Sequence, residues 1–165
     1  MEKLLLEPYN KEWPLKFQDE KKQIYSLFGS DVIYEIHHVG STAIPGLKAK
    51  PIIDIAIEIH RYPPSQTVVD GLIKLEYKHL GECDVPGRHW FIKGSPRKFH
   101  LHLTPINGEV TLNLLKFRDV LRQYPDLQKE YLAIKEKFHG HFELDSHAYN
   151  LAKGPYVKRV LAMNI

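Results

Sequence analysis

Residues 50–60, KPIIDIAIEIH, constrain the fold of this chain more than any other segment. Isoleucine recurs at every second position from 53 to 59, and the side chains of a β-strand alternate between the two faces of its sheet. The isoleucine face must therefore be covered by packed helices. Asp54, Ala56 and Glu58 share the opposite face, which we expect to be at least partly hydrated. The pattern thus predicts a carboxylate, Asp54, on the open face of a buried strand, with Glu58 as a solvated charge at its edge.

A second strand shows the same two-sided pattern. In residues 98–105, KFHLHLTP, His100 and His102 alternate with two leucines. If the two strands are neighbours, Asp54 approaches His100 or His102 on the open face. Two interpretations stay open. These side chains form the solvated side of a two-faced sheet, or they bind a metal ion or carry protons, for which Asp and His are typical residue types.

Hydrophobic periodicity predicts the other elements of the fold. They are, in chain order, a helix at 13–28, strands at 31–39 and 50–60, a helix at 65–77, a hairpin of strands at 88–94 and 98–105, and three helical segments after residue 110. The last segment is predicted to break at Gly154-Pro155, because proline cannot donate a backbone hydrogen bond to a continuing helix. The order predicts an α+β fold: a small mixed sheet packed with helices on one face, followed by a helical C-terminal third. A chain of 165 residues is expected to form one domain, residues 1–165.

Composition narrows the class of partner. The formal charge is +3, which permits an anionic ligand but lacks the dense basic stripes of a nucleic-acid-binding protein. No apolar run reaches the roughly 18 residues of a membrane span, so we expect no membrane partner. The acidic N-terminal segment shows no cleavage site, and the single cysteine forms no internal disulfide. We therefore expect a cytoplasmic protein, and nothing in the sequence selects an oligomeric state.

A turn of small residues, Gly40-Ser41-Thr42, lies between two predicted strands. Such a turn can direct several backbone N–H groups at one point, which suits a phosphate, and the two hydroxyl groups add hydrogen-bond donors. Gly40 permits close approach of another backbone or a ligand. Gly-Ser turns are common, and on these residues alone a purely structural turn is the default interpretation.

The segment HHVGSTAIPGLKAKPIIDI closely resembles the GrpB family, and so do FHLHL, LLKFRDVLRQYP and YNLAKGPYVKRVL in that order. A Gly-Ser pair after a strand, followed by an aspartate inside a hydrophobic strand, is similar to the nucleotidyltransferase signature. The resemblance implies a nucleotidyltransferase-like fold and no particular reaction. It places Gly40 and Ser41 at a triphosphate-holding turn and Asp54 as the first metal-binding carboxylate.

The sequence departs from the nucleotidyltransferase pattern at the other carboxylates. The second is expected two residues after Asp54, where Ala56 stands, and the strand expected to carry the third offers His100 and His102. One aspartate cannot hold two Mg²⁺ ions about 4 Å apart. An aspartate with histidines is more typical of Zn²⁺, Mn²⁺ or another transition metal. The predicted metal ligands are Asp54, His102, His100 and His38, although a strand histidine is often a hydrogen-bonded structural residue.

Three basic residues are candidates for contacting an anionic ligand. Lys50 stands at the entrance of the Asp54 strand, and Arg118 lies on a predicted helix beside Asp119. Lys153 precedes Pro155, which is expected to begin the last helix. Each has a simpler interpretation: an Arg118–Asp119 pair holding the helix to the sheet, and Lys153 as a surface lysine at a helix end.

Three functions fit this set of residues. The first is a metal-dependent nucleotidyltransferase, in which a hydroxyl attacks the α-phosphate of a nucleotide held at the Gly-Ser turn, with Asp54 and His102 as catalytic residues. The second is a non-catalytic module binding a nucleotide or a CoA-related ligand, since some relatives are fused to dephospho-CoA kinase. The third is a single-metal hydrolase. The expected partner in each case is a nucleotide or phosphorylated small molecule, with Mg²⁺, Mn²⁺ or Zn²⁺ as the expected cofactor in the two enzymes.

Overall fold

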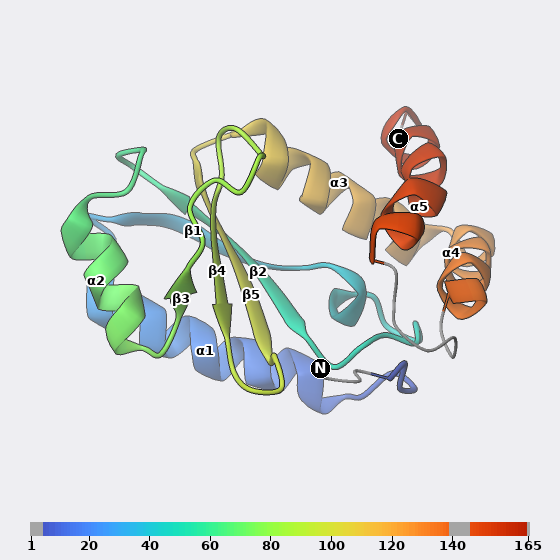
Figure 1. Cartoon of the computed structure of the whole chain (residues 1–165), viewed down its shortest axis with the longest axis horizontal. Helices are drawn as coiled ribbons and strands as arrows, with labels where there is room; N and C mark the ends of the chain where they lie inside the picture. Colours follow the sequence, from blue (N-terminus) through green and yellow to red (C-terminus); the bar gives the residue numbers. More distant parts are fainter. Residues whose placement is uncertain (1–4, 139–145, 165) are drawn as a thin grey trace.

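The computed structural model describes residues 5–138 and 146–164. In these residues the chain forms five α-helices, five β-strands and one short 3₁₀ turn (Figure 1). The elements are α1 (Glu12–Phe28), β1 (Ile33–Val39), η1 (Ser41–Ala43), β2 (Ile53–Ile59), α2 (Gln66–Lys74), β3 (Lys78–His79), β4 (His89–Lys93), β5 (Phe99–Pro105), α3 (Glu109–Gln123), α4 (Pro125–Phe138) and α5 (Ser146–Leu161). No helix in this part of the chain is long and apolar enough to cross a lipid bilayer.

The five strands form one mixed sheet in the order β1-β2-β5-β4-β3. Strands β2 and β5 run parallel, whereas the other neighbouring pairs are antiparallel. The register places Asp54 beside His100 and Ala56 beside His102. The two strands with the two-sided pattern are therefore direct neighbours, which is the condition for the predicted approach of Asp54 to the histidines.

Helices α1 and α2 cover the isoleucine face of the sheet. Helix α1 buries Trp13, Phe17 and Ile24, and α2 buries Leu72. The four isoleucines at positions 53, 55, 57 and 59 of β2 are each at most 2% exposed and belong to the same core cluster. Each fully buried side chain of this size stabilises the fold by about 1.5–3 kcal/mol. This face is the main hydrophobic core, as the alternation predicts.

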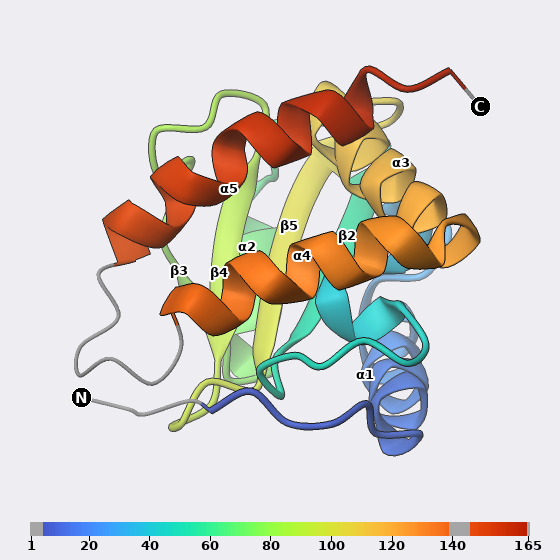
Figure 2. The ribbon, with the colours of Figure 1, turned by 90° about the vertical axis from the view of Figure 1, so that its right-hand side faces the viewer.

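Helices α3, α4 and α5 stand on the other side of the sheet, and Figure 2 shows α4 and α5 in front of β2, β4 and β5. They pack around a second, smaller core. Its buried members are Ile44, Leu47, Val120, Leu121, Tyr131, Tyr156 and Val160. The α+β class, the small mixed sheet and the helical C-terminal third are confirmed. The C-terminal helices screen the polar face of the sheet, so that the open face becomes the wall of a cavity.

The predicted break at Gly154-Pro155 is wrong. Helix α5 runs from Ser146 to Leu161 with Pro155 inside it, so that Pro155 does not begin a helix. Proline removes one backbone hydrogen bond, yet tertiary packing on both sides of the site compensates for that loss. Tyr156 is buried and its hydroxyl donates to the carbonyl of Leu127 in α4. Lys153 therefore projects from the middle of a continuous helix and not from a helix end.

Candidate functional site

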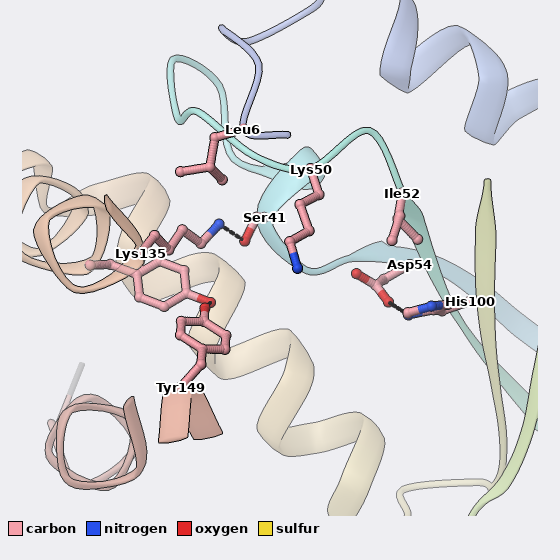
Figure 3. Close-up of a pocket in the computed structure, with 9 residues that line it drawn as sticks. Leu6, Ser41, Lys50, Ile52, Asp54, His100, Lys135 and Tyr149 are labelled. Carbon is pink, nitrogen blue, oxygen red and sulfur yellow. Dashed lines mark hydrogen bonds and ion pairs between the residues drawn. The ribbon is translucent and has the colours of Figure 1, made fainter. Parts of the chain in front are cut away.

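A cavity of about 200 Å³ lies between the polar face of the sheet and helices α4 and α5 (Figure 3). The elements that meet there are far apart in the sequence: the Gly-Ser turn, the segment before β2, strands β2 and β5, and the two helices. The polar side chains that line it include Ser41, Lys50, Asp54, His100, Lys135 and Tyr149. Four of these six residues were predicted from the sequence as site residues.

Asp54 and His100 form one wall of the cavity, and His102 lies behind them in contact with Asp54. The Nδ1 atom of His100 lies 3.3 Å and the Nε2 atom of His102 lies 3.7 Å from Oδ1 of Asp54. Burial would raise the pKa of Asp54, but the contacts with His100 and His102 outweigh burial and hold the pKa well below its usual range. The predicted approach of Asp54 to the histidines is confirmed. The carboxylate is an ionised group in contact with two imidazoles.

Gly40 lies directly against Asp54. Its φ of +75° is in the left-handed region, and a Cβ atom added to it would stand 2.4 Å from Oδ2 of Asp54. Only glycine accepts both the backbone conformation and this close contact without strain. The glycine of the turn therefore lets the turn and the Asp54 carboxylate occupy neighbouring positions, which gives Gly40 a structural role in shaping the site.

Ser41 contacts a lysine that the sequence analysis missed. The Nζ atom of Lys135, on α4, donates to the hydroxyl of Ser41 over 2.5 Å and lies 4.6 Å from the ring centre of Tyr131. Lys135 is only 8% exposed. Burial lowers the pKa of Lys135 to about 7, and the positive charges of Lys153 and Lys50 add to this effect, while Asp54 opposes it. The Gly-Ser turn thus faces a buried lysine that titrates near neutral pH.

Lys50 and Lys153 join Lys135 in a group of three lysines whose charges act on one another. Lys50 lines the cavity and extends into it (Figure 3). Burial lowers the pKa of Lys50, and the positive charge of Lys153 adds to the effect. Burial also lowers the pKa of Lys153, whose Nζ atom lies 4.8 Å from the ring centre of Tyr149. The cavity therefore has two lysines in its lining and a third, Lys153, close enough for its charge to act on theirs, with Asp54 as the carboxylate.

Tyr131 and Tyr149 supply the far wall and were also missed from the sequence. Their hydroxyl groups are 3.2 Å apart, and Tyr131 is a buried member of the second core. The sequence did contain a signal for Tyr131 and Lys135. Lys135 follows Tyr131 by four residues, so both fall on the buried side of a helix whose period was recognised. A lysine at such a position is an exception that indicates function.

Thr42 and His38 lie away from the cavity. Thr42 is 1% exposed, and its hydroxyl is 2.9 Å from Nε2 of His38. His38 stacks on Phe17 of α1 with ring centres 4.8 Å apart, on the isoleucine face of the sheet. The structure therefore does not bring His38 together with Asp54 as a metal ligand, and Thr42 is not placed to contact a phosphate. Both residues join the turn to the core.

His38 gives the fold a dependence on acid. Burial lowers its pKa to about 4, helped by the positive charges of Arg122 and Arg118 and opposed by Asp54. The unfolded chain binds a proton below about pH 6.5 while the folded chain does not, so the free energy of unfolding falls as the pH drops from 6.5 towards 4. We expect a loss of about 2 kcal/mol between pH 7 and 4.5 from this group. Urea denaturation at the two pH values measures it.

The control for His38 is a change that removes titration and keeps size and a hydrogen-bonding group. His38→Gln should lose most of this pH dependence, whereas His60→Gln, at an exposed position, should keep it. An unchanged difference between pH 7 and 4.5 in His38→Gln would contradict a neutral, buried His38.

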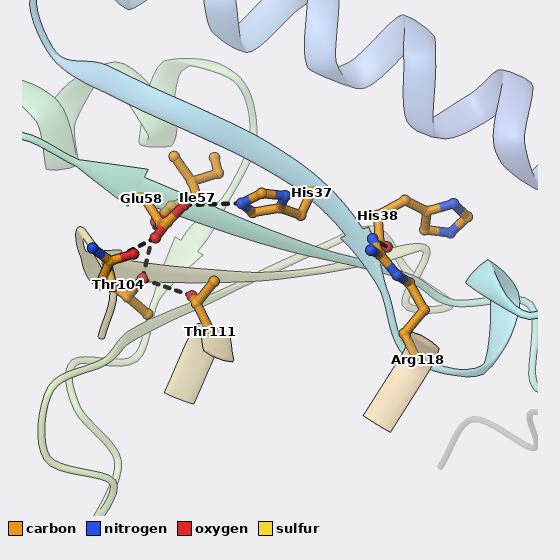
Figure 4. A network of polar contacts seen from close by, with 8 residues as sticks. His37, His38, Ile57, Glu58, Thr104, Thr111 and Arg118 are labelled. Carbon is orange, nitrogen blue, oxygen red and sulfur yellow. Dashed lines mark hydrogen bonds and ion pairs between the residues drawn. The ribbon is translucent and has the colours of Figure 1, made fainter. Parts of the chain in front are cut away.

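Arg118 holds α3 to the sheet (Figure 4). One of its terminal nitrogens donates to the carbonyl oxygen of His38 over 3.0 Å, and its Nε donates to Asp119 over 2.8 Å. The arginine does not line the cavity. Its placement matches the simpler interpretation, an Arg118–Asp119 pair on a helix packed against the sheet, and not a contact with a phosphate.

The prediction that Glu58 is a solvated charge is wrong. Glu58 is 4% exposed, and its carboxylate lies 2.9 Å from Nε2 of His37 and accepts the N–H of Asn107 over 2.8 Å (Figure 4). Helix α3 begins just after Asn107 and covers this end of β2. The hydroxyl groups of Thr111 on α3 and Thr104 on β5 form a hydrogen bond there. Glu58 therefore anchors the covering segment, at the opposite end of β2 from the cavity.

The family of the chain follows from its match to known proteins. A family model described as "GrpB protein" matches residues 3–163. The chain belongs to the GrpB family. A solved structure has the same fold. The crystal structure of the conserved protein GrpB from Enterococcus faecalis aligns with this one with a TM-score of 0.84, over 95% of this chain and 94% of that chain, at 24% identity. That likeness shows the fold, which is nucleotidyltransferase-like.

Two curated relatives of this GrpB chain are longer than it. A UPF0157 protein of Bacillus subtilis is 33% identical over 91% of the chain, which spans 44% of that relative. A protein named dephospho-CoA kinase, from Mycolicibacterium paratuberculosis, is 27% identical over 93% of the chain and 44% of its own length. The chain thus corresponds to less than half of each of these proteins.

The GrpB site does not fit the two-metal arrangement of nucleotidyltransferases. Ala56, at the position of the second carboxylate, is fully buried and has no oxygen to offer. Asp54, His100 and His102 are residue types that Zn²⁺ or Mn²⁺ binds. In the part of the chain that the structure describes, however, no group of three His, Cys, Asp or Glu side chains is arranged to hold a metal ion. A divalent cation stays a prediction.

Proposed function

We propose that this GrpB chain binds a nucleotide or another phosphorylated small molecule in the cavity between the sheet and helices α4 and α5. One observation carries the proposal: Lys50 and Lys135 line a single cavity in which Asp54 is the carboxylate, and the positive charge of Lys153 acts on both lysines. Ser41 and Tyr149 also line the cavity, and their hydroxyl groups add hydrogen-bond donors.

The energetics of the lysines support an anionic ligand. Burial lowers the pKa of all three, so their charged forms are disfavoured in the unliganded protein. A phosphate group brought next to them would favour the charged forms again, and charge-assisted hydrogen bonds are about twice as strong as neutral ones. Perturbed lysines around a cavity are typical of functional sites more than of stabilising ones.

The name of one relative is consistent with this ligand class. Dephospho-CoA kinase is the printed name of the Mycolicibacterium paratuberculosis protein that shares a GrpB-like segment. For the present chain this supports a nucleotide-related ligand, and the lysines at and near the cavity are the structural reason to extend the proposal to it.

A second candidate function is nucleotidyl transfer or hydrolysis in the same cavity. The observation that favours it is the contact of ionised Asp54 with His100 and His102 at the cavity wall. An imidazole there would accept a proton from an attacking hydroxyl, and Asp54 would stabilise the imidazolium. In transfer, the hydroxyl oxygen bonds to the α-phosphorus and pyrophosphate leaves. In hydrolysis, the oxygen of water bonds to the γ-phosphorus, the bond to the bridging oxygen breaks, and inorganic phosphate and the nucleoside diphosphate are the products. The predicted metal-dependent transferase and single-metal hydrolase belong to this candidate.

Calorimetry tests the binding proposal. Pyrophosphate and ATP should bind the wild-type chain, and Lys153→Met should weaken both by about tenfold, the effect of losing about 1.4 kcal/mol. Lys137→Met is the matched control because Lys137 is an exposed lysine on α4. Equal affinities in the two variants, or no binding to the wild type, would contradict the proposal.

A turnover assay separates a binding module from an enzyme. The chain is incubated with each nucleoside triphosphate and with Mg²⁺, Mn²⁺ or Zn²⁺, and the products are measured. Pyrophosphate release that is lost in Asp54→Asn supports a transferase, whereas release of inorganic phosphate supports a hydrolase. Binding without turnover under every condition supports a non-catalytic module.

A further inference from the structure

Several buried polar atoms without a partner gather beside the cavity. Among the described residues, five buried side-chain nitrogen or oxygen atoms make no hydrogen bond, and three of them belong to neighbouring side chains: Nε1 of Trp90, Nε2 of His100 and Nδ1 of His102. A buried polar group that lacks a partner costs about 1–3 kcal/mol. Three such groups in one place need an explanation, and a ligand that brings its own donors and acceptors would satisfy them.

The three side chains form one continuous surface on the polar face of the sheet. Trp90 pairs with His102 across β4 and β5, so their side chains leave the sheet on the same side. The ring of Trp90 meets the ring of His100 edge to face, with centres 5.3 Å apart. His100 also lines the phosphate cavity. The surface therefore begins at the cavity wall on β5 and extends to the next strand, β4, about 10 Å from β2.

Two arginines lie over Trp90. The guanidinium carbon of Arg88 is 5.3 Å and that of Arg97 is 5.9 Å from the centre of the Trp90 ring. The Nε atom of Arg88 is a fourth buried polar atom without a partner. Indole and guanidinium groups both offer flat faces on which a heteroaromatic ring packs.

These features select one ligand chemistry. Flat faces favour a planar ring, and the indole N–H and Arg88 Nε–H are donors that require acceptors in or on that ring. The imidazole nitrogens of His100 and His102 each serve as donor or acceptor according to tautomer. A bare phosphate or a sugar phosphate has no planar ring to offer, whereas a nucleobase combines a π face with ring nitrogens and exocyclic groups.

We infer that Trp90, with Arg88, His100 and His102, forms a nucleobase-binding surface, so that the ligand of the cavity is a nucleotide whose phosphates lie at the three lysines. This inference rests on the proposed function, because it names the substrate class for the same site. The base packs against the Trp90 surface, and the sugar crosses the region of Asp54 and His100.

Tryptophan fluorescence tests whether a ligand contacts Trp90. The chain has two tryptophans, so Trp13→Phe leaves Trp90 as the single reporter. We expect ATP to change the Trp90 emission and tripolyphosphate, which carries the same phosphates without a base, to leave it unchanged. In calorimetry, Trp90→Ala should lower the affinity for ATP by about tenfold, which is within the range for loss of a stacking contact. The same variant should change the affinity for tripolyphosphate by less than about twofold. Arg88→Met is a second variant that should also lower the affinity for ATP, and because Arg88 lies outside strand β4, the change leaves the strand pairing of Trp90 intact.

The outcomes separate the two proposals. If tripolyphosphate and ATP bind equally well and both variants leave ATP unchanged, the nucleobase surface is wrong while the phosphate site stands. If neither ligand binds the wild-type chain, the phosphate site is wrong and the nucleobase surface falls with it. The affinities for ATP, GTP, CTP and UTP then show which base the donors and acceptors prefer. If all four nucleotides bind with the same affinity as tripolyphosphate, the inference is wrong.

Discussion

Gly40→Ala is expected to lower the free energy of unfolding by about 3–5 kcal/mol, the sum of backbone strain and overpacking. The new methyl group would stand 2.4 Å from Oδ2 and 2.9 Å from the Cβ and Cγ atoms of Asp54. Contacts this short cannot be relieved without moving the carboxylate out of its position beside the histidines. The backbone at +75° adds strain for any residue that has a side chain.

The control is Gly46→Ala in the same loop. Gly46 has a φ of +84°, but an added Cβ would meet nothing within 4 Å. This variant carries the strain of a positive φ without the collision, so we expect a loss of about 1 kcal/mol. Chemical denaturation of both variants measures the difference. Equal losses at the two positions would show that Asp54 does not lie against Gly40.

Lys135→Met should raise the free energy of unfolding by about 2 kcal/mol at pH 7 while weakening pyrophosphate binding by about tenfold or more. The lysine has a folded pKa of about 7 against an ordinary value of 10.5, so its charged form is disfavoured in the folded chain. Methionine fills the same space without a charge to desolvate. The gain is smaller than the pKa shift alone implies, because the contacts with Ser41 and Tyr131 are lost.

The pH dependence of this gain has a fixed sign. Below pH 7 Lys135 is protonated in both states, and the folded chain bears the full cost of burying the charge. As the pH rises towards 10, the folded chain holds a neutral amine while the unfolded chain still binds the proton, so the wild type gains stability relative to the variant. Thermal unfolding of wild type, Lys135→Met and the control Lys137→Met at pH 6.5 and 9.5 tests this. A destabilised Lys135→Met with unchanged pyrophosphate affinity would contradict a ligand-binding role.

Alternation along two strands was enough to predict the wall of the site. Period 2 in residues 50–60 and 98–105 separates Asp54, His100 and His102 from the core without any knowledge of the rest of the chain. Strand pairing then determines their contact, and the register places Asp54 beside His100. The fold class followed from the same pattern together with the helical C-terminal third.

The opposite wall could not be predicted in this way. Lys135 meets Ser41 across 94 positions of sequence, and a helical period says which side of α4 is buried but not what lies against it. The prediction that Glu58 is solvated was wrong for a related reason. Alternation places Glu58 on the polar face, but it cannot show that Asn107 and α3 cover that end of the strand. Pro155 shows the limit of local propensity, since packing of Tyr156 keeps α5 continuous around it.

A crystal structure of the chain with ATP tests the central claim most directly. We predict that the triphosphate lies in the cavity between the sheet and α4–α5, with phosphate oxygens within hydrogen-bonding distance of at least two of the three lysines, Lys50, Lys135 and Lys153. A triphosphate bound at another surface of the molecule, with Lys135 still bonded to Ser41, would contradict the account.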